Sequence, residues 1–269
     1  MSELLDGVTH RTVGVRDIPL VLLAPRRLFR RVEDVAAYGW PLVVLLTVVT
    51  LIGYATVQTG LIDREVDRRV SERIAQIEGE QRDVVERSAL REMYAQEYKK
   101  GEFAKLLTRI QVIVAEPARA LAAILLIASV LYGVVALTGR KPEWHTLLTI
   151  CVFAGFIDAF RLLVTLALML RYGTLEVDTS AALLVPLLAA DAQTDPTALV
   201  ALSGLLSAVD PFRIWFWLAV IAGLSVTTQL RGWRAWVTCS LCWLIAAGVR
   251  CGLAVAAVQG AANAAGPNA

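Results

Sequence analysis

The sequence is poor in the residues and motifs that carry enzymatic chemistry. It has two histidines, His10 and His145, and no H-E-x-x-H, G-x-S-x-G or G-x-x-x-x-G-K-[ST] motif. Glu143 lies near His145, but no second pair of metal-ligating residues accompanies them. We therefore expect no enzyme activity, no cofactor and no metal site.

An excess of charge of one sign is also lacking. Lysine and arginine number 26 against 24 acidic residues, a net charge of +2, so the basic excess of a nucleic-acid-binding protein is missing. Residues 1–19 are polar and mixed in charge, without the apolar core of a secretory signal. We predict no nucleic-acid partner and expect residues 1–39 to remain as a cytoplasmic segment.

Cysteines are few and lie in apolar stretches. There are four, and Cys239 and Cys242 form a C-x-x-C pair without histidine or carboxylate neighbours. This setting favours small buried apolar side chains over a metal or redox site, and the spacing shows no disulfide framework.

What the sequence has in abundance is apolar residues. They make up 57% of the chain, and the mean hydropathy is +0.61, against roughly 45–50% apolar residues in soluble domains. A helix needs about 20 apolar residues to cross a hydrocarbon layer of ~30 Å. We predict an all-α membrane protein with five transmembrane helices at residues 40–60, 117–139, 146–170, 212–230 and 235–259.

Residues 146–170 are predicted to form the central span. Asp158 and Arg161 lie near its middle, three residues apart, so they share a helical face, which Gly155 continues. A charge at this depth costs about 2.5 to more than 10 kcal/mol unless it faces a partner, the interior of a bundle or water. We therefore expect the other spans to pack around this one.

The last span adds a further buried charge. Arg250 lies between Gly248 and Gly252, whose G-x-x-x-G spacing permits close contact between helices. If both spans run from inside to outside, Arg161 and Arg250 lie at the same depth and form an intramembrane cluster with Asp158. Either the cluster is a structural pair that docks the two spans, or it is a proton or substrate relay.

Before the first span lies a basic segment. The sequence LLAPRRLFRRV, residues 22–32, places apolar residues at helical spacing after Pro25. Its basic residues are Arg26, Arg27, Arg30 and Arg31. The segment is either an amphipathic helix on the anionic inner leaflet or a basic flank that sets topology, and both interpretations place it inside.

Two segments are predicted to lie outside. Residues 61–116 are dense in both charges and keep an apolar stripe, which indicates an extracytoplasmic helical hairpin with breaks at Gly79 and Gly101. Residues 172–211 form an acidic loop with apolar runs at 181–190 and 197–209. These runs are too short to cross, so they are interfacial helices or a re-entrant hairpin. The basic residues then place the amino terminus inside and the carboxyl terminus outside.

With five spans laid out, a family resemblance can be stated. The stretches that carry it are LLAPRRLFRRV at 22–32, LYGVVALTG at 131–139 and AVDPFRIWFWLAVIAGLSVTTQLRGWRAW at 208–236. The chain resembles the bacterial branch of the Yip domain family over residues 22–259. The resemblance implies five spans in the bacterial cytoplasmic membrane, a cytoplasmic amino terminus and no known catalytic activity.

The resemblance also implies a function. Bacterial relatives are often encoded beside ABC-type exporters and their periplasmic adaptors, so we expect a scaffold or accessory subunit that binds a membrane or periplasmic protein through residues 61–116. The alternative is a small transporter or channel that uses Asp158, Arg161 and Arg250. Besides the lipid bilayer and this protein partner, a homo-oligomer stays open.

Overall fold

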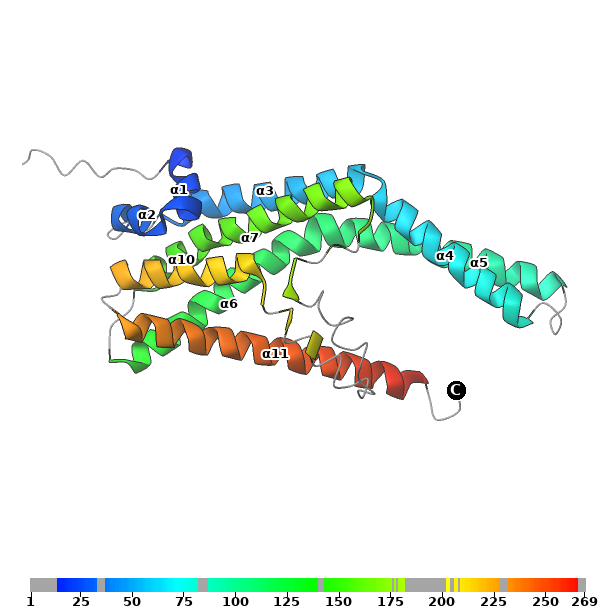
Figure 1. The fold of residues 1–269 in the computed structure, drawn as a ribbon. Helices are drawn as coiled ribbons and strands as arrows, with labels where there is room; N and C mark the ends of the chain where they lie inside the picture. The colour runs from blue at the N-terminus through cyan, green and yellow to red at the C-terminus, as the bar shows by residue number, and fades with distance from the viewer. Residues whose placement is uncertain are drawn as a thin grey trace, which may run out of the picture. The chain divides into compact units, whose positions relative to one another are not determined.

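A computed structural model describes residues 14–32, 37–81, 87–139, 143–175, 177, 179–181, 202–203, 206–207, 209–227 and 232–265. Every regular element within these residues is a helix (Figure 1). Two short helices open the chain, a charged hairpin follows the first long apolar helix, and further apolar helices complete it. The α-helices within the described residues are α1 (Ile18–Leu23), α2 (Pro25–Val32), α3 (Gly39–Gln58), α4 (Leu61–Gln81), α5 (Arg87–Ile110), α6 (Glu116–Leu137), α7 (Trp144–Tyr172), α10 (Pro211–Thr227) and α11 (Trp233–Ala265).

The chain divides into two compact units. Unit 1 comprises Met1–Leu45, Ile124–Asp158 and Ser180–Ala269, and unit 2 comprises Leu46–Ala123 and Ala159–Thr179. The boundaries fall inside α3, α6 and α7, so each of these helices contributes one part to each unit.

Three of the described helices are long and apolar enough to cross a membrane. They are α3, the continuous helix Arg87–Leu137 and α7. α10 is apolar but has 17 residues, a length of about 25 Å, and α11 runs for 33 residues. The chain is thus an all-helical membrane protein. The predicted segments 181–190 and 197–209 lie almost wholly outside the described residues.

The most enclosed of these three helices is α7. In its most apolar stretch 67% of the residues are buried, against 22% in each of the other two. Every residue from Leu147 to Ile157 is buried, and all of them are apolar apart from Thr149 and Gly155. This agrees with the expectation that residues 146–170 form the central span.

Neighbouring helices approach α7 closely in unit 1. A Cβ atom added to Gly155 would lie 2.8 Å from Cδ2 of Leu45 in α3. A Cβ atom added to Gly223 of α10 would lie 2.7 Å from Cγ2 of Ile150. The ring centroids of Trp40 and Phe153 are 6.4 Å apart with an edge-on geometry. These contacts fix α3 and α10 against α7.

The return arm of the hairpin and the next span form one helix. Arg87–Leu137 is continuous over 51 residues, with a π-helical turn at Gln111–Ala115. Pro117 follows this turn; it has no N–H, and its ring needs more room than an α-helical turn offers. The wider turn just before it provides that room, so the helix continues past the proline.

The predicted breaks at Gly79 and Gly101 are therefore wrong. Gly79 lies inside α4, and Gly101 lies inside α5 and is buried. α4 ends at Gln81 and α5 begins at Arg87. Glycine lowers helix propensity by only about 1 kcal/mol, and at Gly101 the packing between the two arms offsets that cost.

The helix boundaries follow local chemistry. Gly60, between α3 and α4, and Gly173, after α7, both have φ of +68°, a conformation that ends a helix and that glycine adopts without strain. At the start of α10, the backbone N–H of Phe212 donates to Oδ1 of Asp210 at 2.9 Å. Asp210 thus caps the helix and places a negative charge at its amino-terminal end.

Candidate functional site

The charged hairpin is held by ion pairs between its two arms. Nη2 of Arg109 lies 2.7 and 2.6 Å from the two carboxylate oxygens of Asp63. Nζ of Lys105 lies 2.7 Å from Oδ1 of Asp67. Asp63 and Asp67 are four residues apart, as are Lys105 and Arg109, so each pair shares one face of its helix. The two arms therefore pair in an antiparallel register.

Close packing continues this register away from the ion pairs. A Cβ atom added to Gly101 would lie 2.7 Å from Cγ2 of Val70 and 3.9 Å from Cγ1 of Val66. Glycine at this point lets α5 approach α4 closely. Ile77 and Leu90, farther along the arms, are buried. The hairpin thus has its own small core, which explains how a segment rich in charge keeps a defined structure.

Charges along α4 also support one another within the helix. Glu65 accepts hydrogen bonds from Arg68 at 2.7 Å and from Arg69 at 2.6 Å. These hydrogen bonds lower the pKa of the Glu65 carboxyl to about 2. The bond from Arg68 has the largest effect, and the bond from Arg69 has the next largest. In α5, hydrogen bonds to Asp67 and then to Glu102 raise the pKa of the Lys105 ammonium above its ordinary value. Both groups stay charged across the physiological range.

The opposite face of α5 is apolar and exposed. Four side chains on it are each at least half exposed, namely Phe103, Leu106, Leu107 and Ile110. Successive residues are rotated by about 100° around a helix, so Phe103 lies roughly 200° from Gly101, which faces α4. We call these four residues the α5 stripe. It turns away from α4 and offers a continuous apolar surface.

The basic helix α2 has two differently used faces. Its four arginines, predicted as a membrane-surface group, are all exposed: Arg26, Arg27, Arg30 and Arg31. Its apolar side chains Leu28, Phe29 and Val32 are buried, and α2 packs against α10. Nη1 of Arg31 lies 2.7 Å from Oδ1 of Asp17, which ties α2 to the turn before α1. The apolar face is covered by protein, while the arginines remain accessible.

The predicted intramembrane charges are described in part. Asp158 and Arg161 are both half-buried, and Nε of Arg161 is shielded from solvent. Each has an interaction partner within the chain. The backbone of Arg250 lies in α11, but its side chain is outside the described residues. A cluster that includes Arg250 therefore stays a prediction.

The three predicted packing glycines differ in their surroundings. Gly155 lies in close contact with Leu45, as described above, and a Cβ atom on it would lie 3.4 Å from Cδ1 of Ile124. Gly248 and Gly252 are exposed, and a Cβ atom on either would meet no atom within 4 Å. The helix contact predicted at these two positions stays a prediction.

The described cysteines do not form a metal-binding cluster with acidic groups. Cys151, Cys239 and Cys242 are buried, each at most 4% exposed. Among the residues that the structure describes, no three His, Cys, Asp or Glu side chains could hold a metal ion together.

The ion pairs between the arms of the hairpin are not among the features predicted from the sequence. The signal was present, because Asp63 and Asp67 share one face of the outgoing arm while Lys105 and Arg109 share one face of the return arm. Treating Gly101 as a break concealed it, since a break there places the basic pair in another element. With Gly101 inside α5, the spacing 63–67 against 105–109 predicts the register.

Among comparisons with known proteins, one found a match to this chain. A family model described as the Yip1 domain matches residues 20–250, which include the helices α3, α6, α7 and α10 and the charged hairpin. Comparison with curated proteins and with solved structures found no match. The match confirms the family resemblance seen in the sequence. The chain belongs to the Yip1 domain family.

Proposed function

We propose that this membrane protein is a scaffold or accessory subunit of a larger membrane complex and binds its partner through the α4–α5 hairpin. The observation that carries the proposal is the α5 stripe. Four large apolar side chains stand exposed on a helix whose opposite face contacts α4. Contiguous apolar surfaces of this kind mark interaction sites.

The hairpin is suited to present such a surface. Its arms are fixed by the ion pairs Asp63–Arg109 and Asp67–Lys105 and by the contact between Gly101 and Val70. A preorganised surface loses less conformational entropy on binding than a flexible one. α5 also continues into α6 as one helix, so no loop separates the stripe from the span that follows it.

The proposed setting is a bacterial cytoplasmic membrane with five spans, formed by α3, α6, α7, α10 and α11. In unit 1, α2, the end of α10 and the beginning of α11 lie at the same end (Figure 1). The exposed arginines of α2 and Arg234 at the start of α11 gather there. Basic residues favour the cytoplasmic side, which supports an amino terminus inside, a carboxyl terminus outside and an extracytoplasmic hairpin. An ABC-type exporter with a periplasmic adaptor is the partner we propose on the family resemblance.

Co-purification from native membranes in mild detergent tests the proposal. Replacing Phe103 and Leu107 together by serine should abolish recovery of the partner, as should deletion of the hairpin. Gln96→Ser is the matched control, because Gln96 is exposed and lies on the same face of α5 two turns earlier. Recovery of the same partner from the hairpin deletion would overturn the proposal.

A second candidate is a small transporter or channel. It is favoured by one observation, the half-buried Asp158 and Arg161 in the most enclosed of the spanning helices, since ionisable groups inside a membrane are functional candidates. Under this alternative, flux in reconstituted vesicles survives deletion of the hairpin and is lost in Asp158→Asn. Under the scaffold proposal, Asp158→Asn lowers stability instead.

A further inference from the structure

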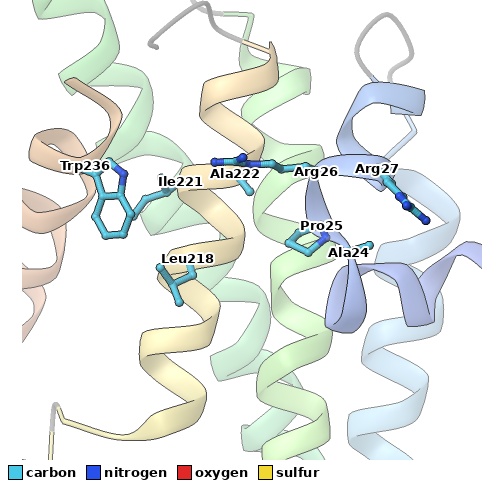
Figure 2. Close-up of a pocket in the computed structure, with 8 residues that line it drawn as sticks. All are labelled: Ala24, Pro25, Arg26, Arg27, Leu218, Ile221, Ala222 and Trp236. Atoms are coloured by element: carbon cyan, nitrogen blue, oxygen red, sulfur yellow. The ribbon is translucent and has the colours of Figure 1, made fainter. Parts of the chain in front are cut away.

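An apolar cavity opens beside the basic helix. It has a volume of about 380 Å³ and lies between α2, α10 and α11 within unit 1. Its walls include Arg26 and Arg27 of α2, Leu218, Ile221 and Ala222 of α10, and Trp236 of α11 (Figure 2). Apart from the two arginines, every lining side chain is apolar or aromatic. The cavity therefore has apolar walls and a positively charged rim.

A second hollow of about 150 Å³ extends the first one along α10 and α11. Leu218, Ile221 and Trp236 line both, and the second adds Ile214 and Trp217 among its walls. Together they form one groove along α10. From residue 222 to residue 214 this groove runs for about 12 Å, close to the ~15 Å depth of one leaflet of a hydrocarbon layer.

The charge at the rim is directed into the groove. Figure 2 shows the side chain of Arg26 extending from α2 across Ala222 towards Trp236, whereas the guanidinium of Arg27 points the other way. Arg26 is exposed and makes no ion pair with any residue in the described parts of the chain. A guanidinium is well suited to bind a phosphate oxygen, and the groove below it is suited to a hydrocarbon chain.

We propose that this groove binds one anionic diacyl phospholipid from the leaflet that faces α2. The phosphate contacts Arg26, and one acyl chain lies along Leu218, Ile221 and Trp236 towards Ile214. Leu218 and Trp236 are 42% and 53% exposed, and the acyl chain covers them. The buried apolar face of α2 holds the helix on α10, so the arginine keeps its place above the groove. The proposal does not depend on the role of the hairpin.

Native mass spectrometry of the full chain in mild detergent tests this site. Dioleoyl phosphatidylglycerol and dioleoyl phosphatidylcholine, added separately, share their acyl chains and differ in headgroup charge. We expect the anionic lipid to be retained preferentially as a single adduct. Arg26→Gln should weaken its binding at least about fivefold, since one basic group at a membrane surface contributes ~1 kcal/mol. Arg30→Gln is the matched control, because Arg30 is exposed on the same helix but does not line the groove.

A steric variant tests the acyl-chain part separately. Leu218→Trp adds bulk to a half-exposed wall of both hollows and should reduce binding of both lipids without unfolding the protein, which the thermal unfolding midpoint verifies. Equal retention of the two lipids by the unmodified chain would overturn the proposal. An equal loss of lipid binding in Arg26→Gln and Arg30→Gln would also overturn it. So would the detection of a protein dimer in place of a lipid adduct.

Discussion

Replacing Gly53 by alanine tests how α3 packs on the π-helical turn. A Cβ atom on Gly53 would lie 2.6 Å from the carbonyl oxygen of Val112 and 3.3 Å from its carbonyl carbon. In a π-turn, the carbonyl of one residue accepts a hydrogen bond from the backbone N–H of the residue five positions later. For Val112 that residue is Pro117, which has no N–H. The glycine Cα can approach this oxygen closely, with a weak C–H···O contact, whereas alanine would overlap it.

The steric cost of Gly53→Ala depends on whether the overlapping atoms can move apart. The obstructing atoms belong to backbone, inside the 51-residue helix, so no side-chain rotation relieves the overlap. Overpacking of this kind typically costs 1–3 kcal/mol. Alanine also gains roughly 0.5–1 kcal/mol over glycine in a helix interior, which partly masks the loss. The experiment therefore needs a control variant in which alanine brings the gain in helix propensity without the steric overlap.

Gly133→Ala is that control. Gly133 lies in α6, is exposed, and a Cβ atom on it meets nothing within 4 Å. The difference in unfolding free energy between Gly53→Ala and Gly133→Ala isolates the steric cost, which we expect to be about 1–3 kcal/mol. Equilibrium unfolding of the two variants in the same detergent measures it. Equal stability would refute the close approach of α3 to the π-helical turn.

Three further outcomes are expected. Gly101→Leu should separate the arms of the hairpin at Val70 and lower its protection from amide hydrogen exchange, whereas unchanged protection would contradict the contact. The folded pKa of Glu65, about 2, lies below its ordinary value of 4.5. Its contribution to hairpin stability is therefore complete above pH ~4.5 and declines as pH falls towards 2, which hydrogen exchange of α4 measures against Glu65→Gln, a variant that should lack this dependence. Asp158→Asn should lower the unfolding midpoint in detergent if the carboxylate is structural; an unchanged midpoint would contradict that role.

Much of the membrane part could be predicted from apolar patterning. The sequence indicates long apolar stretches, and the structure contains helices over most of each of them, with α7 the most enclosed of those long enough to cross. The charges at Asp158 and Arg161 predicted this enclosure, because a charge exposed to lipid is costly. That argument needs only energetics and residue spacing.

The hairpin was predicted as an element but not in its detail. The local sequence around Gly101 predicts a break in the helix. In the structure Gly101 instead allows close contact with Val70, which lies far from it along the chain. Likewise, the apolar residues of α2 suit a membrane surface by their spacing, yet Leu28 and Phe29 are fully buried in the protein. Periodicity identifies an apolar face and does not reveal what covers it.

The sequence by itself determined that this is a helical membrane protein with a charged helical segment, because hydropathy, periodicity and charge density are local properties. Only the tertiary structure decided that Asp63 pairs with Arg109, that Gly53 meets the carbonyl of Val112, and that Arg26 stands above an apolar groove. Each of these contacts joins residues distant in the chain, and their approach depends on how whole helices pack.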